Sequence, residues 1–255
     1  MRNVTEVVKQ LIIINILFFI GTQFLGDVAY KYLSLYYPEN PDFNYWQPLT
    51  HMFMHGNVMH IFFNMFALFS FGSALEQIWG AKKFLFFYIS CGLGAALIHI
   101  ISNYFFFHEG LNTLVANGIP KEEILNIMRE GKYDSSWTEL LSKSNFESFT
   151  SAFVTPAVGA SGAVYGLLVA FAFMFPNAEL ALMFIPIPIK AKYFVPVIVS
   201  LDLFSGVTGF SVFGGGIAHF AHVGGALFGF LMVWYWKKIN LMPIVGINTL
   251  LNEYH

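Results

Sequence analysis

Long apolar runs separated by short polar segments occupy most of the chain. Six of these runs are predicted to be membrane-spanning helices, because a span needs about 20 apolar residues. The six predicted spans are Leu11 to Gly26, Asn57 to Gln77, Lys83 to Phe107, Ala157 to just before Pro176, Lys192 to Leu203, and Ile217 to Trp236. The fifth is short unless it continues to Thr208. We therefore expect an all-α membrane protein in which residues 1–255 form one bundle of six transmembrane helices.

Composition favours the same class. Of the 255 residues, 56% are hydrophobic and only 11% are charged, whereas soluble domains carry about 25% charged residues. The expected surroundings are a lipid bilayer, and the net charge of −2 argues against a nucleic acid partner. The single cysteine, Cys91, lies inside an apolar run, so no disulfide framework is expected.

Basic residues at the ends of the apolar runs predict the orientation in the membrane. Eight of the 13 Lys and Arg residues lie in short segments on one side if the N-terminus is cytoplasmic: Arg2, Lys9, Lys82, Lys83, Lys190, Lys192, Lys237 and Lys238. This distribution agrees with the positive-inside rule. No convincing cleavage site follows the first apolar run, so we interpret it as a retained span. We expect a multi-pass protein of a bacterial inner (plasma) membrane, with the N- and C-termini in the cytoplasm.

Two longer polar segments are predicted to lie on the opposite, outer side. Residues 27–50 include Tyr45-Trp46, which suits a membrane interface. Residues 108–150 form an extracytoplasmic insert between spans three and four. Within it, residues 120–129 have proline and acids at their start, as in the first turn of a short helix. On the cytoplasmic side, residues 185–188 read Ile-Pro-Ile-Pro and cannot form a continuous helix.

Polar side chains inside the predicted spans are the strongest functional signal, because they are expensive to bury in hydrocarbon. His60 and Asn64 share one face of the second span by their i, i+4 spacing. Ser161 opens the fourth span, and His222 lies about five residues into the sixth. These three spans run in the same direction, so the helical rise of about 1.5 Å per residue places His60, Ser161 and His222 at a similar depth near the outer side.

This set of side chains fits serine acyl-transfer chemistry. Ser161 would be the nucleophile and His222 its base, provided that spans four and six touch. His60 and Asn64 would donate hydrogen bonds to an oxyanion. Glycines at four-residue steps in both spans would permit the close contact: Gly162, Gly166, Gly225 and Gly229.

Each of these residues also has a structural interpretation. The small residues around Ser161 can be a helix-packing face, and His222 or Asn64 can be hydrogen-bonding residues between helices. A transporter or channel is a further alternative, but it would need an ionisable path across both halves of the membrane. Here the polar residues cluster on the outer side only.

A metal site is the other interpretation of the histidines His51, His55 and His60. It is disfavoured, because neither a cysteine nor a carboxylate accompanies them and no His-Glu-x-x-His sequence occurs. We therefore expect no metal and no cofactor.

Three motifs, taken together, resemble those of the rhomboid family of intramembrane serine proteases. The family's Gly-x-Ser-Gly signature matches residues 159–162, with Tyr165 following. Its His-x-x-x-Asn pair matches His60 and Asn64, and its Ala-His-x-x-Gly-x-x-x-Gly motif matches residues 221–229. The resemblance covers nearly the whole chain and depends on the order and spacing of the three motifs together.

The resemblance implies a rhomboid-like helical bundle with a catalytic dyad of Ser161 and His222. His60, Asn64 and the backbone N–H of Ser161 would form the oxyanion hole. The implied activity is cleavage of other membrane proteins in or beside their transmembrane segments. The alternative is a non-catalytic rhomboid-fold binder of membrane helices, in which Ser161 is dispensable. The oligomeric state is left open.

The resemblance also implies supporting roles. Tyr165 would stack on His222 and hold it, and Gly159 and Gly162 would support the serine as members of its signature. A dyad needs no third carboxylate, so Asp202, the one acid near that depth, is expected to be a helix-end residue. Glu76 would be structural.

The chain departs from the family pattern in two places. Trp46-Gln47 stands where the family often has Trp-Arg, and the lost positive charge puts lipid or loop anchoring in doubt rather than catalysis. The insert at residues 108–150 is the second departure. In addition, the loop of residues 205–218 contains Gly214 to Gly216 and is expected to be a mobile cap over the site.

Overall fold

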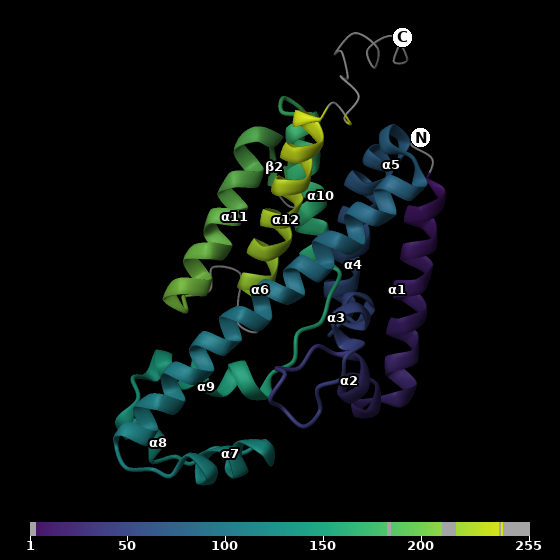
Figure 1. Cartoon of the computed structure of the whole chain (residues 1–255). Helices are drawn as coiled ribbons and strands as arrows, with labels where there is room; N and C mark the ends of the chain where they lie inside the picture. Colours follow the sequence, from purple (N-terminus) through teal and green to yellow (C-terminus); the bar gives the residue numbers. More distant parts are fainter. Residues whose placement is uncertain (1–3, 183–184, 211–217, 240, 242–255) are drawn as a thin grey trace, which may run out of the picture.

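The computed structural model describes residues 4–182, 185–210, 218–239 and 241, and these residues are mainly helical (Figure 1). A helix stands at each of the six predicted spans. These are α1 (Glu6–Leu25), α4 (Val58–Ala67) with η2 (Leu68–Gly72) and α5 (Ser73–Trp79), α6 (Ala81–Ala116), α10 (Ser161–Met174), α11 (Ala191–Thr208) and α12 (His219–Lys238). The predicted all-α membrane bundle is therefore confirmed.

The predicted number of six membrane spans is not fully confirmed. Among the described residues, four helices are long and apolar enough to cross a membrane: Glu6–Leu25, Val58–Trp79, Ala81–Ala116 and Ala191–Thr208. The helix α10 has only 14 residues, short of the usual 20, and α12 is not among the four. The fifth predicted span does continue to Thr208.

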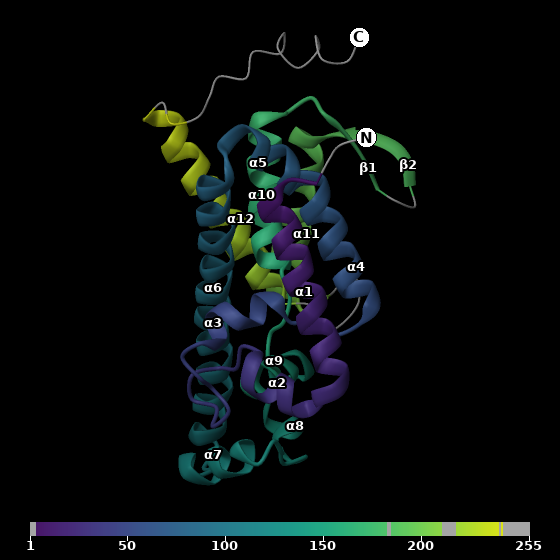
Figure 2. The ribbon, with the colours of Figure 1, turned by 90° about the vertical axis from the view of Figure 1, so that its right-hand side faces the viewer.

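The start of α1 and the end of α12 lie at one end of the bundle (Figure 1). The same end carries an antiparallel hairpin of β1 (Glu179–Leu182) and β2 (Ile185–Lys190), which pairs Glu179 with Lys190. The sequence had excluded a helix at residues 185–188, and these residues lie in a strand. The other end carries α2 (Asp27–Leu33) and the insert helices α7 (Lys121–Arg129), α8 (Trp137–Leu140) and α9 (Lys143–Val154), as Figure 2 shows from a second side.

The predicted third span is longer than expected. The helix α6 has 36 residues and ends at Ala116, nine residues after Phe107. At 1.5 Å per residue it is about 54 Å long, well beyond the ~30 Å hydrocarbon core. Its last turns pack against the insert through a cluster of buried apolar side chains: Phe107, Leu111, Leu114, Ile124, Leu125, Met128, Trp137, Leu141, Phe149, Ala152 and Phe153. The predicted insert helix at residues 120–129 is present as α7.

Glycines set the contact between α10 and α12. A Cβ on Gly225 would stand 1.8 Å from the carbonyl oxygen of Gly162, and one on Gly229 would stand 2.7 Å from Gly166 Cα. The backbones of the two helices are therefore in contact, with no room for a side chain between them. The third helix of this contact is α6, because a Cβ on Gly162 would lie 2.4 Å from Ala95 Cβ.

A buried carboxylate anchors the first helix. Glu76, on α5, is only 6% exposed and accepts hydrogen bonds from Val7 N at 3.0 Å, Val8 N at 2.9 Å and Thr5 Oγ1. These donors lie at the start of α1, where backbone N–H groups have no partner inside the helix and the helix dipole favours an anion. Glu76 is thus a capping residue supplied by another helix, which agrees with the structural role expected for it.

Replacing Gly225 with alanine tests the backbone contact. We expect Gly225→Ala to lower the free energy of unfolding by about 1–3 kcal/mol or more, because overpacking forces backbone shifts. Gly21→Ala is the matched control, since a Cβ on Gly21, also within a helix, meets nothing within 4 Å. In thermal unfolding in detergent, Gly225→Ala should melt lower than Gly21→Ala. Equal melting temperatures would contradict the contact.

Candidate active site

The helix α10 begins at Ser161, four residues later than the predicted span. Before it the chain is extended: Ala157 pairs with Leu35 in an isolated β-bridge, and Gly159 N donates to the carbonyl of His51 at 2.9 Å. Gly159 has φ +126°, a conformation that side chains other than hydrogen rarely allow. This backbone leads into the helix, so that Ser161 is its first residue.

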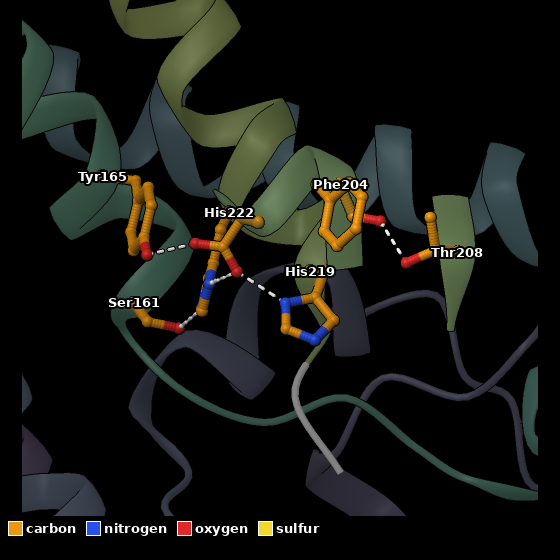
Figure 3. A network of polar contacts seen from close by, with 7 residues as sticks. Ser161, Tyr165, Phe204, Thr208, His219 and His222 are labelled. Atoms are coloured by element: carbon orange, nitrogen blue, oxygen red, sulfur yellow. Dashed lines mark hydrogen bonds and ion pairs between the residues drawn. The ribbon is translucent and has the colours of Figure 1, made fainter. Parts of the chain in front are cut away.

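His222 meets Ser161 across the glycine contact. His222 Nε2 lies 2.8 Å from Ser161 Oγ, a hydrogen-bond distance (Figure 3). The ring of Tyr165, one turn along α10, stacks on the His222 imidazole with centroids 4.3 Å apart and an interplanar angle of 12°. The structure therefore brings together three residues that the sequence had singled out on two different helices.

The structure places Asp202 beside His222, so the expectation that it is a helix-end residue is wrong. It lies inside α11, six residues before the end of that helix, and is 1% exposed. Asp202 Oδ1 is 3.2 Å from His222 Nδ1 and 2.6 Å from Nδ1 of His219, and the Tyr165 hydroxyl donates to Oδ2. The error arose because the sequence does not say which face of α11 points at α12.

His219 was not among the residues that the sequence singled out. It is the first residue of α12 and is 9% exposed. The spacing of three residues puts both imidazoles on one face of the helix. This spacing, together with Asp202 at a similar depth, was the signal in the sequence that could have predicted the contact between His219 and Asp202.

The two predicted oxyanion donors lie differently. His60 is near the serine: a Cβ on Gly159 would stand 2.7 Å from His60 Nε2 and 3.5 Å from Ser161 Oγ. Asn64 is buried, one turn further along α4, and its Nδ2 donates to the His60 carbonyl at 2.9 Å. The structure thus brings His60 to the site, whereas the bonded contact of Asn64 is to its own helix.

His51 and His55, the remaining histidines of the disfavoured metal interpretation, lie close to the site. His51 is 4% exposed, and its Nδ1 donates to the Gln47 carbonyl at 3.0 Å. His55 is fully buried, and its ring meets that of His60 edge-on, with the ring centroids 4.9 Å apart. In the part of the chain that the structure describes, no three His, Cys, Asp or Glu residues form a group that could hold a metal.

Gln47, which stands where the family often has an arginine, anchors the loop of residues 27–50. Gln47 is fully buried. Its amide accepts from Tyr36 N at 3.2 Å and donates to the carbonyls of Lys31 at 3.2 Å and Asp42 at 2.8 Å. In the same loop, Lys31 Nζ donates a hydrogen bond to the Asp42 carboxylate at 2.9 Å, which raises the pKa of Lys31. The doubt about loop anchoring is therefore removed, because a neutral amide satisfies three backbone groups at once.

The cap predicted over the site cannot be placed. Gly214 to Gly216 lie outside the described residues, which resume at Ala218. The described part of this loop begins at the end of α11, where Gly209 adopts a left-handed conformation with φ +72°.

Fold and site together define a helical membrane protein with a serine and a histidine paired inside the bundle. The model of the Rhomboid domain matches residues 42–116 and 135–239. The chain therefore belongs to the rhomboid family. The match omits residues 117–134, which contain α7, so this part of the insert is what the family pattern lacks.

Curated relatives agree with this membership. Rhomboid protein 1, mitochondrial, of Saccharomyces cerevisiae is 27% identical over 186 residues, which cover 73% of this chain and 40% of the relative. The human Presenilin-associated rhomboid-like protein, mitochondrial, is 28% identical over 205 residues, or 78% of this chain and 41% of the relative. A mitochondrial rhomboid protein of Schizosaccharomyces pombe is 29% identical over 226 residues, or 80% and 54%.

The lengths and names of these relatives can be compared with the length and the expected location of this chain. The chain spans roughly two fifths to one half of their lengths. The chain is a multi-pass integral membrane protein, but the expected bacterial inner membrane is not borne out, because these relatives are mitochondrial by name.

Gly159→Ala tests the geometry at the start of α10. The new Cβ would crowd His60 Nε2 at 2.7 Å and strain a backbone at φ +126°. A displacement of about 1 Å in a site that pairs a nucleophile with its base can cost about 10²-fold in rate, so we expect a comparable fall in the rate at which a fluorophosphonate labels Ser161.

The control for this change is Gly118→Ala. Gly118 also has a positive φ of +91°, but a Cβ there meets nothing within 4 Å. It should therefore keep the wild-type rate while carrying a similar backbone strain. An unchanged labelling rate in Gly159→Ala would show that this glycine does not set the position of Ser161.

Proposed function

We propose that the chain is an intramembrane serine endopeptidase that cleaves transmembrane segments of other membrane proteins. The observation that carries the proposal is the 2.8 Å contact between Ser161 Oγ and His222 Nε2 inside an apolar helical bundle. Membership of the rhomboid family supports it, since that family consists generally of intramembrane serine proteases. The partners are then membrane-protein substrates within a lipid bilayer.

In the acylation step, Ser161 Oγ attacks the scissile carbonyl carbon while its proton passes to His222 Nε2. The Oγ–H bond breaks as the new N–H and C–O bonds form. His222 then gives this proton to the leaving amine, and the same histidine activates a water molecule to release the acyl group. The Tyr165 ring, stacked at 4.3 Å, restricts the imidazole to the orientation that these transfers require.

Negative charge develops on the carbonyl oxygen beside the start of α10. The first amides of a helix have no partner within it, and they lie at the positive end of the helix dipole. The first backbone hydrogen bond of α10 runs from Val164 N to Ala160 O at 3.0 Å. The N–H of Ser161 lies before it and can therefore donate to an anion. We assign His60 and Asn64 as side-chain donors. Asn64 Nδ2 retains a second N–H besides the one given to the His60 carbonyl.

The substrate must be locally unwound. A helical peptide bond is hydrogen-bonded within its own helix and covered by side chains, so neither its carbonyl carbon nor its oxygen is free for Ser161 and the donors. Transmembrane segments with low helix propensity, such as those containing glycine, lose less on unwinding. We therefore expect these segments to be the preferred substrates.

Substitutions at the proposed site give the direct test, in cleavage of a fluorogenic transmembrane substrate by the purified chain in detergent. Ser161→Ala and His222→Ala should each abolish turnover, and the double variant should cost little more than either, because the residues of a catalytic unit are not additive. Asn64→Ala should keep slow cleavage, since losing one oxyanion donor costs about 10²–10³ in rate. Its KM should change little, because that bond strengthens mainly in the transition state.

Ser135→Ala is the control, the same change at an exposed serine of the insert, and it should cleave as the wild type does. Cleavage by Ser161→Ala at the wild-type rate would refute the proposal that the chain is a serine protease. In that case the helix-binding alternative, which does not need the serine, becomes the better account.

A further inference from the structure

A carboxylate buried in a membrane helix needs a reason to be there. Asp202 is 1% exposed within α11, and a charged group in this position is costly unless it is paired and hydrogen-bonded. Well-packed apolar residues often replace such a group without loss of stability. Packing by itself therefore does not require a carboxylate at this position, and the contacts of Asp202 point toward the site.

The carboxylate has three donors around its two oxygens. His219 Nδ1 at 2.6 Å and His222 Nδ1 at 3.2 Å share Oδ1, while the Tyr165 hydroxyl donates to Oδ2 (Figure 3). A carboxylate accepts hydrogen bonds, so each of these imidazole Nδ1 atoms carries a proton. A neutral imidazole has one N–H, which leaves His222 Nε2 as a lone pair directed at Ser161 Oγ, 2.8 Å away.

His219 and Tyr165 hold Asp202 from two sides. Among the described residues, the polar contact of His219 is with the Asp202 carboxylate and not with Ser161. Tyr165 contacts both the carboxylate and the His222 ring. With one oxygen fixed by each residue, the carboxylate cannot rotate away from His222 without losing a hydrogen bond.

We propose that Asp202 and His219 are positioning residues of the catalytic base: Asp202 fixes the tautomer and orientation of His222, and His219 fixes Asp202. The proposal rests on the proposed protease function and extends the pair Ser161–His222 by two further residues. During acylation the proton moves only from Ser161 Oγ to His222 Nε2 and then to the leaving amine. Asp202 stays ionised throughout and stabilises the imidazolium through its Nδ1–H.

The competing account is that Asp202 only ties α11 to α10 and α12 by hydrogen bonds. Such a role would change melting temperature, and substrate binding with it, but would not change kcat selectively. The positioning role predicts that substitution lowers kcat and leaves KM nearly unchanged, and that a replacement hydrogen-bond donor restores kcat. The purely structural role predicts neither result.

The test compares Asp202→Asn, His219→Leu and His219→Gln in the full chain, using the fluorogenic transmembrane substrate and thermal melting. Asp202→Asn should lower kcat by about 10²-fold or more with KM within about twofold, because the corresponding change in a Ser-His-Asp triad leaves the wrong tautomer and costs about 10⁴. His219→Leu should lower kcat by about tenfold, the lower end of the cost of about 10–100-fold for losing a partner that orients a metal-bound histidine. His219→Gln should recover most of this, because its amide N–H can replace the imidazole donor.

Ser161→Ala in the same series separates the two claims. If Ser161→Ala is inactive while Asp202→Asn keeps the wild-type kcat, the protease stands and the positioning role is overturned. If Ser161→Ala cleaves normally, the protease itself is overturned. Should Asp202→Asn not fold, the two His219 variants decide the matter: an equal kcat in His219→Leu and His219→Gln contradicts the proposal.

Discussion

The arrangement of this molecule depends on the absence of side chains where α10 and α12 meet. In lipid, helices gain little by burying apolar surface against one another, so contact depends on close packing and on polar bonds. Gly225 faces the carbonyl of Gly162 so closely that even a methyl group would stand 1.8 Å from it. This approach brings the first residue of α10 within 2.8 Å of a histidine on α12. The proposed chemistry is thus a consequence of how two helices pack.

Hydrogen bonds provide the other contacts between helices. The carboxylates of Glu76 and Asp202 are both buried, and each accepts several of these hydrogen bonds. Glu76 accepts from three donors at the start of α1, and Asp202 accepts from two imidazoles and a tyrosine hydroxyl. Each charge is offset by several hydrogen bonds from groups on other helices. Glu76 fixes the first helix against α5, whereas Asp202 lies beside the proposed nucleophile and base. The same physical device therefore serves the fold at one end of the bundle and the site nearer the other.

The elements were predictable where a local pattern determines them. Apolar runs defined the helices at all six predicted spans, and motif spacing singled out Ser161, His222 and His60. The start of α10 was not predictable, because an apolar run from Ala157 does not reveal that Gly159 takes a positive φ and keeps the chain extended. Asp202 was missed because its role depends on which face of α11 meets α12. The extension of α6 and its packing on the insert depend likewise on contacts between distant segments.

The central claim is that Ser161 is a nucleophile activated by His222 inside the membrane bundle. The most direct measurement is mass spectrometry of the wild-type chain after reaction with a fluorophosphonate, an electrophile that is selective for activated serines. The account predicts one adduct per chain, located on the peptide that contains Ser161 and absent when His222 is replaced by alanine. No adduct on the folded wild-type chain, or an adduct on another serine, would contradict it.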